Sequence, residues 1–597
     1  PRFQVFGGVR FGGTVTVEDA WHLGFDHLAI CIGAGLPQAL PVPGSLAPGM
    51  RQANDFLMAL QLTGAAKREN LANLQVRLPA VVIGGGLTGI DTATEIQAYY
   101  IVQVEKLLAR YETLSAAKNE AGVRAGLDEG ALKILDEFLT HGRAVRAERE
   151  RARTADAAPD LQGLIRQWGG VTVAYRKGMN HSPAYTRNHD EIIKAFEEGI
   201  YYAEGLDPKE ARVDRYGQVE ALVARRLTPN AAGEWVDSGE DAVIPARAIL
   251  VATGARPNVA YEFEHKGHFS KERGHYQTFH DVGGALEAVP VAAHCKVDNF
   301  GPFTSYAVHD RRVSFLGDTH PVFHGSVVKA IASGLRTYPK IISALGDKTA
   351  ATGTDEEYKI FRAHMQDLLL PRVQSVTRHS ASVVELTVRA PLAARKFRPG
   401  HFFRLQNFET QAPLIDGARL QTETLALTGA KVDADAGTVS LIVLELGASS
   451  RLVATLRPGE PVALMGPTGV RTHIGEGDET VMVVGGRRGA AHIRAVGPAL
   501  RAKGKRVLYI AGFPSADEIF CQDDLEAAAD AILWVTERGA PITPRRPQDR
   551  ALTAPILDAI LAYAAGRLEA KGAPPLIPLQ DVDRLLIIGI NRLVRFM

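Results

Sequence analysis

The chain has 597 residues, with 68 Lys and Arg against 67 Asp and Glu, and 46% of its residues are hydrophobic. At roughly 150 residues per domain the length predicts about four domains, and the ordinary apolar and charged fractions exclude a disordered or fibrous chain. A net charge of +1 excludes the strong positive field with which nucleic-acid-binding proteins attract their ligand.

The three cysteines, Cys31, Cys295 and Cys521, are solitary and far apart. Without a CxxC pair they predict neither a disulfide framework nor a local iron–sulfur or metal site, and the 18 histidines show no ligand spacing. We therefore expect no resident metal and a reducing, cytoplasmic setting. The apolar stretches fall far short of the ~18–20 residues of a membrane-spanning helix, so no transmembrane segment is expected. Because the chain begins at Pro1 without a starting Met and stops at Met597 after a strand-like run, we interpret it as part of a longer polypeptide.

Glycine clusters where apolar, β-type runs end, which is typical of the strand–turn–helix units that bind dinucleotides. The alternation of strands and helical stretches predicts a multidomain α/β architecture with parallel sheets. The runs lie at residues 28–35, 80–95, 248–257, 313–318, 481–493 and 585–589.

The strongest single motif is GxGxxG at Gly84, Gly86 and Gly89, between an apolar strand and a helical stretch. Glycine is needed there because the backbone must turn tightly, approach a pyrophosphate and pack the helix on the strand. The helix start at Leu87 and Thr88 then offers free N–H groups to phosphate oxygens. We predict dinucleotide binding, with a purely structural turn as the alternative.

Two features follow this motif. Residues 96–167 are rich in Ala, Glu, Lys, Arg and Leu at helical spacing, which predicts an inserted helical pair. This insert is either a self-packed, solvated element or a docking surface for a partner. The next expected strand, residues 171–177, ends in Arg176 and Lys177, where an acidic residue would select NAD and a basic one accommodates the 2′-phosphate of NADP. NADP(H) is therefore favoured, the alternative being an exposed basic pair.

The order of motifs, from LAICIGAG through GGGLTGIDTATE and ATGARP to LGD and HGSVVKAIASG, resembles two flavoproteins: the glutamate synthase small subunit and the large subunit of NADH-dependent ferredoxin:NADP+ oxidoreductase. In these proteins a nicotinamide domain interrupts the FAD domain. The resemblance implies such a two-dinucleotide-binding arrangement, with the FAD domain at residues 1–78 and 258–343 and the NAD(P)H domain at 79–257. The family's first FAD loop and its cluster cysteines would lie before Pro1, so iron–sulfur clusters are expected outside this chain or in its partners.

The resemblance also implies which residues surround the flavin. Gly317 and Asp318 would form the second FAD motif, with Asp318 contacting the ribityl chain or a phosphate; its alternative role is to cap a helix. His324, beside this motif, is the one histidine considered for acid–base work, whereas His181, His189 and His320 are interpreted as surface or loop residues. The other expected cofactor-binding positions are Gly33, Gly35, Thr253, Gly254, Gly325, Ser326 and Val327.

The second half changes in character. Residues 344–368 are expected to form a linker, because their first part is mostly small, polar or acidic. Alternating runs with Pro-Gly turns over residues 369–474 predict a small antiparallel barrel. Strands and helices alternate again over residues 475–597, which predicts a second α/β nucleotide domain.

The segments FRPGHFFRLQ, LELGASSRL, RPGEPVALMGPTG and VMVVGGRRGAAHI resemble ferredoxin reductase-type proteins, above all the electron-transfer subunit of dihydroorotate dehydrogenase. The resemblance implies an FAD-holding barrel followed by an NAD(H)-binding domain. The family's flavin signature contains an Arg, but residues 423–428 (ETLALT) have none, so one FAD is expected and a second is left open, with Arg404 as a substitute. The expected cofactor-binding residues of this half are Arg404, Gly466, Thr468, Gly469, Gly485, Gly486 and Gly489; the last three are alternatively a plain strand–helix turn.

Together these patterns predict an NAD(P)H-dependent flavoprotein oxidoreductase that passes electrons through FAD to iron–sulfur centres and a ferredoxin-like or other protein acceptor. The alternative is a reductase like the glutamate synthase small subunit, which feeds a separate catalytic subunit, with the second half a degenerate partner-binding module. A multisubunit or homo-oligomeric complex is expected in either case. No residue is assigned a catalytic role.

Overall fold

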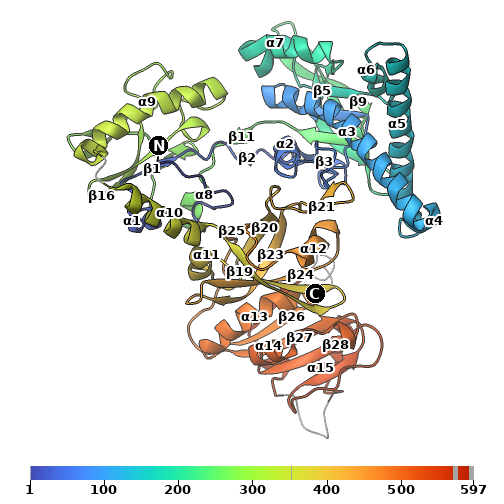
Figure 1. Ribbon diagram of the computed structural model, residues 1–597, viewed down its shortest axis with the longest axis vertical. Coiled ribbons are helices and arrows are strands. Elements are labelled where there is room, and N and C mark those ends of the chain that lie inside the picture. The colour runs from blue at the N-terminus through green and yellow to red at the C-terminus, as the bar shows by residue number, and fades with distance from the viewer. Residues whose placement is uncertain (1, 351–352, 569–575, 590–597) are drawn as a thin grey trace. The chain divides into compact units, whose positions relative to one another are not determined.

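The computed structural model describes residues 2–350, 353–568 and 576–589 (Figure 1). The chain divides into two compact units. The first-half unit comprises His27–Gly346 with Asp416–Ala418, and the second-half unit comprises the remaining described residues. Among the described residues, none of the helices combines the length and apolar character needed to cross a bilayer.

The first-half unit is built around a five-stranded sheet in which every neighbouring pair is parallel. All four residues of each of its two central strands are buried, as expected when helices cover both faces of a parallel sheet. This confirms the predicted α/β character of this half. In sheet order the strands are β3 (Met50–Gln52), β10 (Ala248–Val251), β4 (Ala80–Ile83), β5 (Val171–Ala174) and β6 (Tyr201–Ala203).

Residues 96–167 are helical, as predicted, but they do not form a separate insert. Helix α3 begins at the glycine motif and runs unbroken over Leu87–Lys118, and α5 (Glu129–Thr154) packs along it. Gly142 of α5 allows the close approach, because a Cβ there would lie 2.7 Å from the carbonyl oxygen of Val104. The short helices α4 (Glu120–Arg124) and α6 (Leu161–Gln167) complete the region, and α5 and α6 are capped by Asp128 and Asp160.

Two further sheets of three or more strands belong to the first-half unit. One is antiparallel and contains β7 (Leu206–Val213), β8 (Val219–Pro229) and β9 (Trp235–Pro245). The other is mixed, in the order β1 (His27–Ile30), β17 (Arg311–Phe315), β16 (Phe303–Val308), β14 (Phe279–Val282) and β15 (Ala285–Ala288). Helix α9 (Val327–Leu345) packs against β17 of the mixed sheet. Helices α2 (Ala53–Leu62) and α7 (Pro183–Glu197) instead pack against α3 beside the parallel sheet, and α8 (Ala260–Glu264) is a short helix of the same unit.

The second-half unit contains a six-stranded antiparallel sheet that closes on itself. The first and last strands meet through backbone hydrogen bonds from the Val373 N–H to the Glu460 carbonyl oxygen at 2.9 Å and from the Val462 N–H to the Pro371 carbonyl oxygen at 3.0 Å. The predicted barrel is therefore present. Its strands, in order, are β18 (Arg372–Ser380), β19 (Val383–Arg389), β24 (Thr438–Leu444), β23 (Leu425–Asp433), β20 (Phe402–Asn407) and β25 (Val462–Thr468).

A second all-parallel sheet follows the barrel, as the strand and helix alternation predicts. Its strand order is β29 (Arg550–Thr553), β28 (Ala531–Thr536), β27 (Arg506–Phe513), β26 (Thr480–Gly485) and β30 (Arg584–Ile588). Its helices are α13 (Arg487–Ala502), α14 (Gln522–Ala528) and α15 (Ile556–Ala564), and the barrel carries α11 (Pro391–Lys396) and α12 (Ala448–Leu452).

The structure corrects two expectations about segment boundaries. Residues 344–368, interpreted as a linker, contain α10 (Asp355–Leu369), whose first turn is closed by a capping box of Thr354 and Glu357. The acidic residues that suggested a solvated linker instead favour the positive end of this helix. Residues 2–26, assigned to the FAD domain, belong to the second-half unit and include α1 (Val17–His22). Apolar side chains of this segment pack against buried residues of α10.

Candidate functional site

The loop between β4 and α3 requires glycine at two of its three motif positions, Gly84 for its backbone conformation and close contact and Gly89 for close contact alone. Gly84 has φ +138°, and a Cβ on it would lie 2.2 Å from the carbonyl oxygen of Ala252. A Cβ on Gly89 would lie 2.4 Å from the carbonyl oxygen of Gly84. These two glycines therefore serve the tight turn and the close packing of helix on strand.

The middle glycine has the opposite surroundings. A Cβ built on Gly86 meets no atom of the described residues within 4 Å, so the space in front of it is open. Gly86 is also the N-cap of α3, where it has no side chain to satisfy the first N–H groups of the helix. Leu87 is half-buried and Thr88 exposed at this helix start. The loop thus offers an open face lined by backbone donors, which suits the approach of a phosphate group.

Arg176 and Lys177 lie at the same sheet edge as this loop. They follow β5 directly, and β5 pairs in parallel with β4, with Val173 opposite Val82. Both basic side chains are exposed. The structure therefore brings the predicted ribose-proximal residues next to the glycine loop, as adjacent parallel strands require.

Thr253 and Gly254 follow β10, the other neighbour of β4. They are hydrogen-bonded there to residues 33–38, a segment from much earlier in the chain. The Thr253 Oγ1 donates to the Gln38 carbonyl oxygen at 3.2 Å, and the Gln38 N–H donates to the Gly254 carbonyl oxygen at 2.9 Å. The short strands β2 (Leu36–Pro37) and β11 (Ala255–Arg256) pair here, and we call the place where residues 33–38 meet residues 253–258 the crossing.

Gly33 and Gly35, which are also expected near a flavin, lie in the same segment, residues 33–38. The Asn258 N–H donates to the Gly33 carbonyl oxygen at 2.9 Å. A Cβ on Gly35 would lie 3.6 Å from the side-chain nitrogen of Asn258. The structure therefore brings Gly33 and Gly35 together with Gly254, although they are far apart in sequence.

The predicted second FAD motif forms a compact loop at the end of β17. The Gly317 N–H donates to the Ser333 Oγ at 2.8 Å, and the Asp318 Oδ1 accepts a hydrogen bond of 2.6 Å from the Gly325 N–H. Ser326 caps α9 through its Oγ, and Val327 opens the helix with its side chain exposed. Asp318 thus shapes the loop, a role close to the capping alternative.

The two histidines of this loop differ in environment. His320 lies in the loop, as one of its two predicted settings has it, but it is fully buried and not on the surface, and burial lowers its pKa to about 4. Its Nδ1 accepts from the Val322 N–H, so the Nε2 donates to the Gly301 carbonyl oxygen at 3.0 Å. His324 is exposed, and its ring lies 5.5 Å from that of His275. His320 therefore acts as a neutral structural residue.

The glycine turn of the second-half unit is more closed than the one at Gly86. A Cβ on Gly485 would lie 2.9 Å from the Cα of Gly489, and a Cβ on Gly486 would lie 3.0 Å from the Gly512 carbonyl oxygen. At the start of α13, the Arg487 guanidinium is held by the Glu518 carboxylate at 2.5 Å. These contacts favour the alternative of a strand–helix turn.

The residues expected to hold a flavin on the barrel are dispersed. Arg404 is exposed on β20, and a Cβ on Gly469 would lie 2.9 Å from the Phe402 ring. The end of β25, which includes Gly466 and Thr468, contacts the N-terminal segment, because the Thr14 Oγ1 donates to the Gly466 carbonyl oxygen at 2.6 Å. Sequence reasoning missed this contact, since nothing local marks residues 2–26 as part of this unit.

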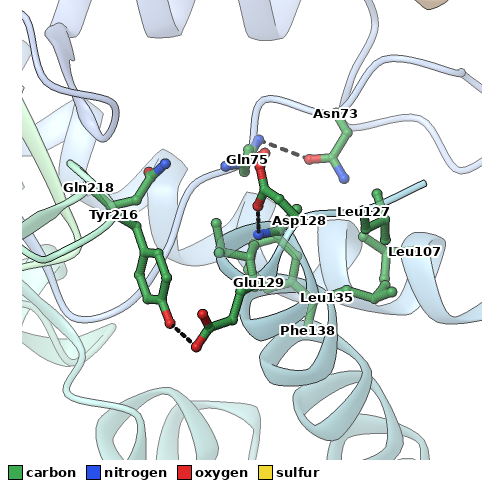
Figure 2. Close-up of a pocket in the computed structure, with 13 residues that line it drawn as sticks. Asn73, Gln75, Leu107, Leu127, Asp128, Glu129, Leu135, Phe138, Tyr216 and Gln218 are labelled. Carbon is green, nitrogen blue, oxygen red and sulfur yellow. Dashed lines mark hydrogen bonds between the residues drawn. The ribbon is translucent and has the colours of Figure 1, made fainter. Parts of the chain in front are cut away.

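A separate cavity of about 710 Å³ lies between α3, α5 and the β7–β8 turn (Figure 2). The Tyr216 hydroxyl donates to the Glu129 Oε1 at 2.5 Å, and Asp128 caps the adjacent helix turn. Leu107, which lines the cavity, is separated from Leu87 by roughly 30 Å of helix at 1.5 Å per residue. This cavity is therefore distinct from the glycine-loop site.

Comparison with known proteins found no protein-family model that matches the chain. The chain is 30% identical over 498 residues to Uncharacterized protein RP006 of Rickettsia prowazekii, an alignment that covers 81% of this chain and 59% of that protein. It is 26% identical over 152 residues to the electron transfer subunit of dihydroorotate dehydrogenase B (NAD(+)) of Bacillus cereus, covering 25% of this chain and 56% of the subunit. The chain thus spans less than two thirds of the length of these relatives.

Among solved structures, the chain is similar to Mycobacterium tuberculosis FprA in complex with NADPH, with 17% identity, 61% of this chain and 75% of that chain covered, and a TM-score of 0.34. A structure of the NADH-dependent reduced ferredoxin–NADP oxidoreductase gives 20% identity over 29% of this chain and 58% of that chain, with a TM-score of 0.25.

Proposed function

We propose that the protein is an FAD-dependent NAD(P)H oxidoreductase. The observation that carries this proposal is the β4–α3 loop, in which Gly84 and Gly89 fix a tight turn and Gly86 leaves its face open toward the start of α3. A nucleotide pyrophosphate fits this loop, because backbone N–H groups and the helix dipole both favour negative charge there.

The nucleotide of this site would be NADP(H). The exposed side chains of Arg176 and Lys177 follow β5, the strand next to the loop. Their charge would stabilise the 2′-phosphate that distinguishes NADP from NAD, and residues 175–177 (YRK) contain no carboxylate to hold the 2′-hydroxyl of NAD.

One FAD would be held by the first-half unit, around Gly33, Gly35 and Gly254 at the crossing and around Gly317 and Gly325 at the end of β17. Each of these glycines except Gly35 has a positive φ, which suits close approach of a ligand to the backbone. When bound, a flavin accepts hydride from a reduced nicotinamide and can release the electrons singly. The role of this chain would be to bind and orient both groups and to exclude water.

The acceptor would be a protein with iron–sulfur centres, such as a ferredoxin-like partner or another part of a longer polypeptide. The partial similarity of the chain, over 152 residues, to an electron transfer subunit supports this direction. In this form the protein would join a reductase like the glutamate synthase small subunit to a ferredoxin reductase-type module in a multisubunit or homo-oligomeric assembly.

In a second candidate function the first half is the same reductase, and only the role of the second half differs. The closed turn at Gly486 and the absence of Arg from residues 423–428 favour a module that binds a partner subunit without its own flavin. The first half would then feed a separate catalytic subunit.

The amount of FAD released by acid from purified full-length protein, measured by chromatography per polypeptide, tests the proposal. Two FAD per chain would support the double-flavin enzyme, and one would support the version with a partner-binding second half. Absence of FAD, together with absence of NADPH-dependent reduction of an artificial acceptor after incubation with FAD, would overturn both.

A further inference from the structure

Three potential metal ligands from separate elements converge in the second-half unit. His379 lies near the end of β18, Glu385 lies on the neighbouring strand β19, and Cys521 is the N-cap residue of α14. The His379 Nε2 is 2.7 Å from the Glu385 Oε2, and the Cys521 Sγ is 3.5 Å from that nitrogen and 3.9 Å from that oxygen. All three donor atoms therefore lie within 4.8 Å of one another, close enough to contact one metal ion.

These distances are close to those of a tetrahedral zinc site. Bond lengths of about 2.3 Å to sulfur and about 2.0–2.2 Å to nitrogen and oxygen place neighbouring ligand atoms roughly 3.3–3.6 Å apart. The sulfur–nitrogen distance of 3.5 Å matches, and the sulfur–oxygen distance of 3.9 Å is a little longer. The Cys521 Sγ is also 3.8 Å from the His379 Nδ1, so the sulfur lies beside the ring. For an ion to enter, the hydrogen bond between His379 and Glu385 has to lengthen and the imidazole has to turn its Nε2 toward the sulfur.

Glu385 is held in place from behind, as ligating carboxylates are in metal sites. The Arg494 Nη2 donates to the Glu385 Oε1 at 3.1 Å and, at the longer distance of 3.4 Å, to the Oε2 that also contacts His379. The Arg494 side chain is 4% exposed and also pairs with Asp524 at 2.6 Å. With the cysteine as thiolate, three negative groups face one positive arginine, and the divalent cation would balance the remaining charge.

The cluster opens into a cavity of about 390 Å³, so a water molecule has room to complete the coordination. The cavity wall carries two further carboxylates, of which Asp523 pairs with Arg545 at 2.5 Å. Asp523 is thereby oriented by the arginine rather than by the cluster.

We propose that His379 Nε2, Glu385 Oε2 and Cys521 Sγ form a binding site for a zinc-class divalent cation, with water as the fourth ligand. A thiolate with an imidazole and a carboxylate favours Zn²⁺ over hard cations such as Mg²⁺ and Ca²⁺. As the sulfur–metal bond forms, the thiol proton leaves to solvent. The ion joins β18 and β19 of the barrel to the loop before α14 in the nucleotide-type domain, and thereby stabilises their junction.

Titration of the full chain, without a histidine tag, with Co²⁺ and Zn²⁺ tests this proposal. We expect one ion per chain, a thiolate-to-cobalt charge-transfer absorption, and a higher melting temperature with Zn²⁺. Cys521→Ser should abolish the absorption and weaken Zn²⁺ binding at least tenfold, whereas the matched controls Cys31→Ser and Cys295→Ser should retain both.

The proposal is overturned if the unchanged chain binds no stoichiometric Zn²⁺, or if Cys521→Ser binds it as tightly as the unchanged chain. Should Cys521→Ser fail to fold, His379→Gln provides the second test: tenfold weaker binding supports the site, and unchanged affinity overturns it. The titration needs neither flavin nor nucleotide and its readouts report the metal alone, so this result is separate from that of the proposed function.

Discussion

The Thr14 Oγ1 donates a hydrogen bond of 2.6 Å to the carbonyl oxygen of Gly466, which lies 452 residues further along the chain. The same Oγ1 accepts from the Arg10 N–H, and Thr14 is only 5% exposed. A Cβ on the nearby Gly8 would lie 2.7 Å from the Cβ of Ala463, so the segment approaches β25 closely. The N-terminal segment is therefore an integral part of the barrel's surroundings.

Replacement of Thr14 by Val should destabilise the second-half unit by about 1–3 kcal/mol, because it leaves the buried Gly466 carbonyl without its donor while preserving side-chain volume. Urea unfolding, with hydrogen exchange of the β25 amides as the local readout, measures the effect. Thr113→Val, at an exposed position of α3, is the control and should change little. Unchanged exchange in the Thr14 variant would contradict this contribution.

Gly86→Ala should fold normally and bind NADPH poorly. The new Cβ meets no described atom within 4 Å, so the loss of stability should stay within about 1 kcal/mol, while the methyl group occupies the space needed by the pyrophosphate. We expect at least a tenfold rise in the NADPH dissociation constant, measured by fluorescence titration.

Gly84→Ala is the matched comparison for this variant. Its Cβ would lie 2.2 Å from a backbone oxygen at φ +138°, so it should lower the melting temperature strongly. A Gly86→Ala protein that binds NADPH as the unchanged protein does would remove the glycine loop from the proposed site.

Arg176→Glu should reduce kcat/KM for NADPH at least tenfold and leave kcat/KM for NADH nearly unchanged, because only NADPH carries the 2′-phosphate. Steady-state reduction of an artificial acceptor with each nucleotide gives the ratio. Arg226→Glu, an exposed position on β8, is the control for a general charge effect. An equal loss with both nucleotides would argue against 2′-phosphate recognition by Arg176.

Stability of the first-half unit should fall as the pH is lowered from about 6.5 to about 4. Burial lowers the pKa of both His27 and His320 from 6.5 to about 4, so in this window the unfolded chain binds more protons than the folded one. For the fully buried His320 the slope is at most about 1.4 kcal/mol per pH unit.

Urea unfolding at several pH values measures this slope. His320→Gln should flatten it, whereas substitution of the exposed His189 by Gln should leave it unchanged. A profile for His320→Gln identical to that of the unchanged protein would show that His320 is not responsible.

The strands, turns and helices could be predicted because each depends mainly on the residues of one short stretch of sequence. Fully buried parallel strands such as β4 and β26 appear as apolar, β-branched runs, and the glycines that end them mark the turns. The helical character of residues 96–167 follows from side-chain spacing in the same way. The turn at Gly84, Gly86 and Gly89 and the place of Arg176 after the next strand could be predicted for this reason, whereas their binding of a nucleotide stays a prediction.

The remaining features depend on contacts between distant segments, which a single sequence does not record. The helix α10 was missed, because the small, polar and acidic residues around its capping box of Thr354 and Glu357 suggested a linker. The attachment of Thr14 to β25 and the meeting of His379 with Cys521 have no local signal, since their elements are far apart in the chain. Spacing alone could not find these residues.

The continuity of α3 limits how this protein can be dissected. Residues 96–167 cannot be excised as a loop, because the cut would fall within the helix that starts at the glycine turn. It would also remove Phe138 and Val145, which share one hydrophobic core with Val82 of the central strand. A minimal nucleotide-binding fragment must therefore keep the helical hairpin of α3 and α5.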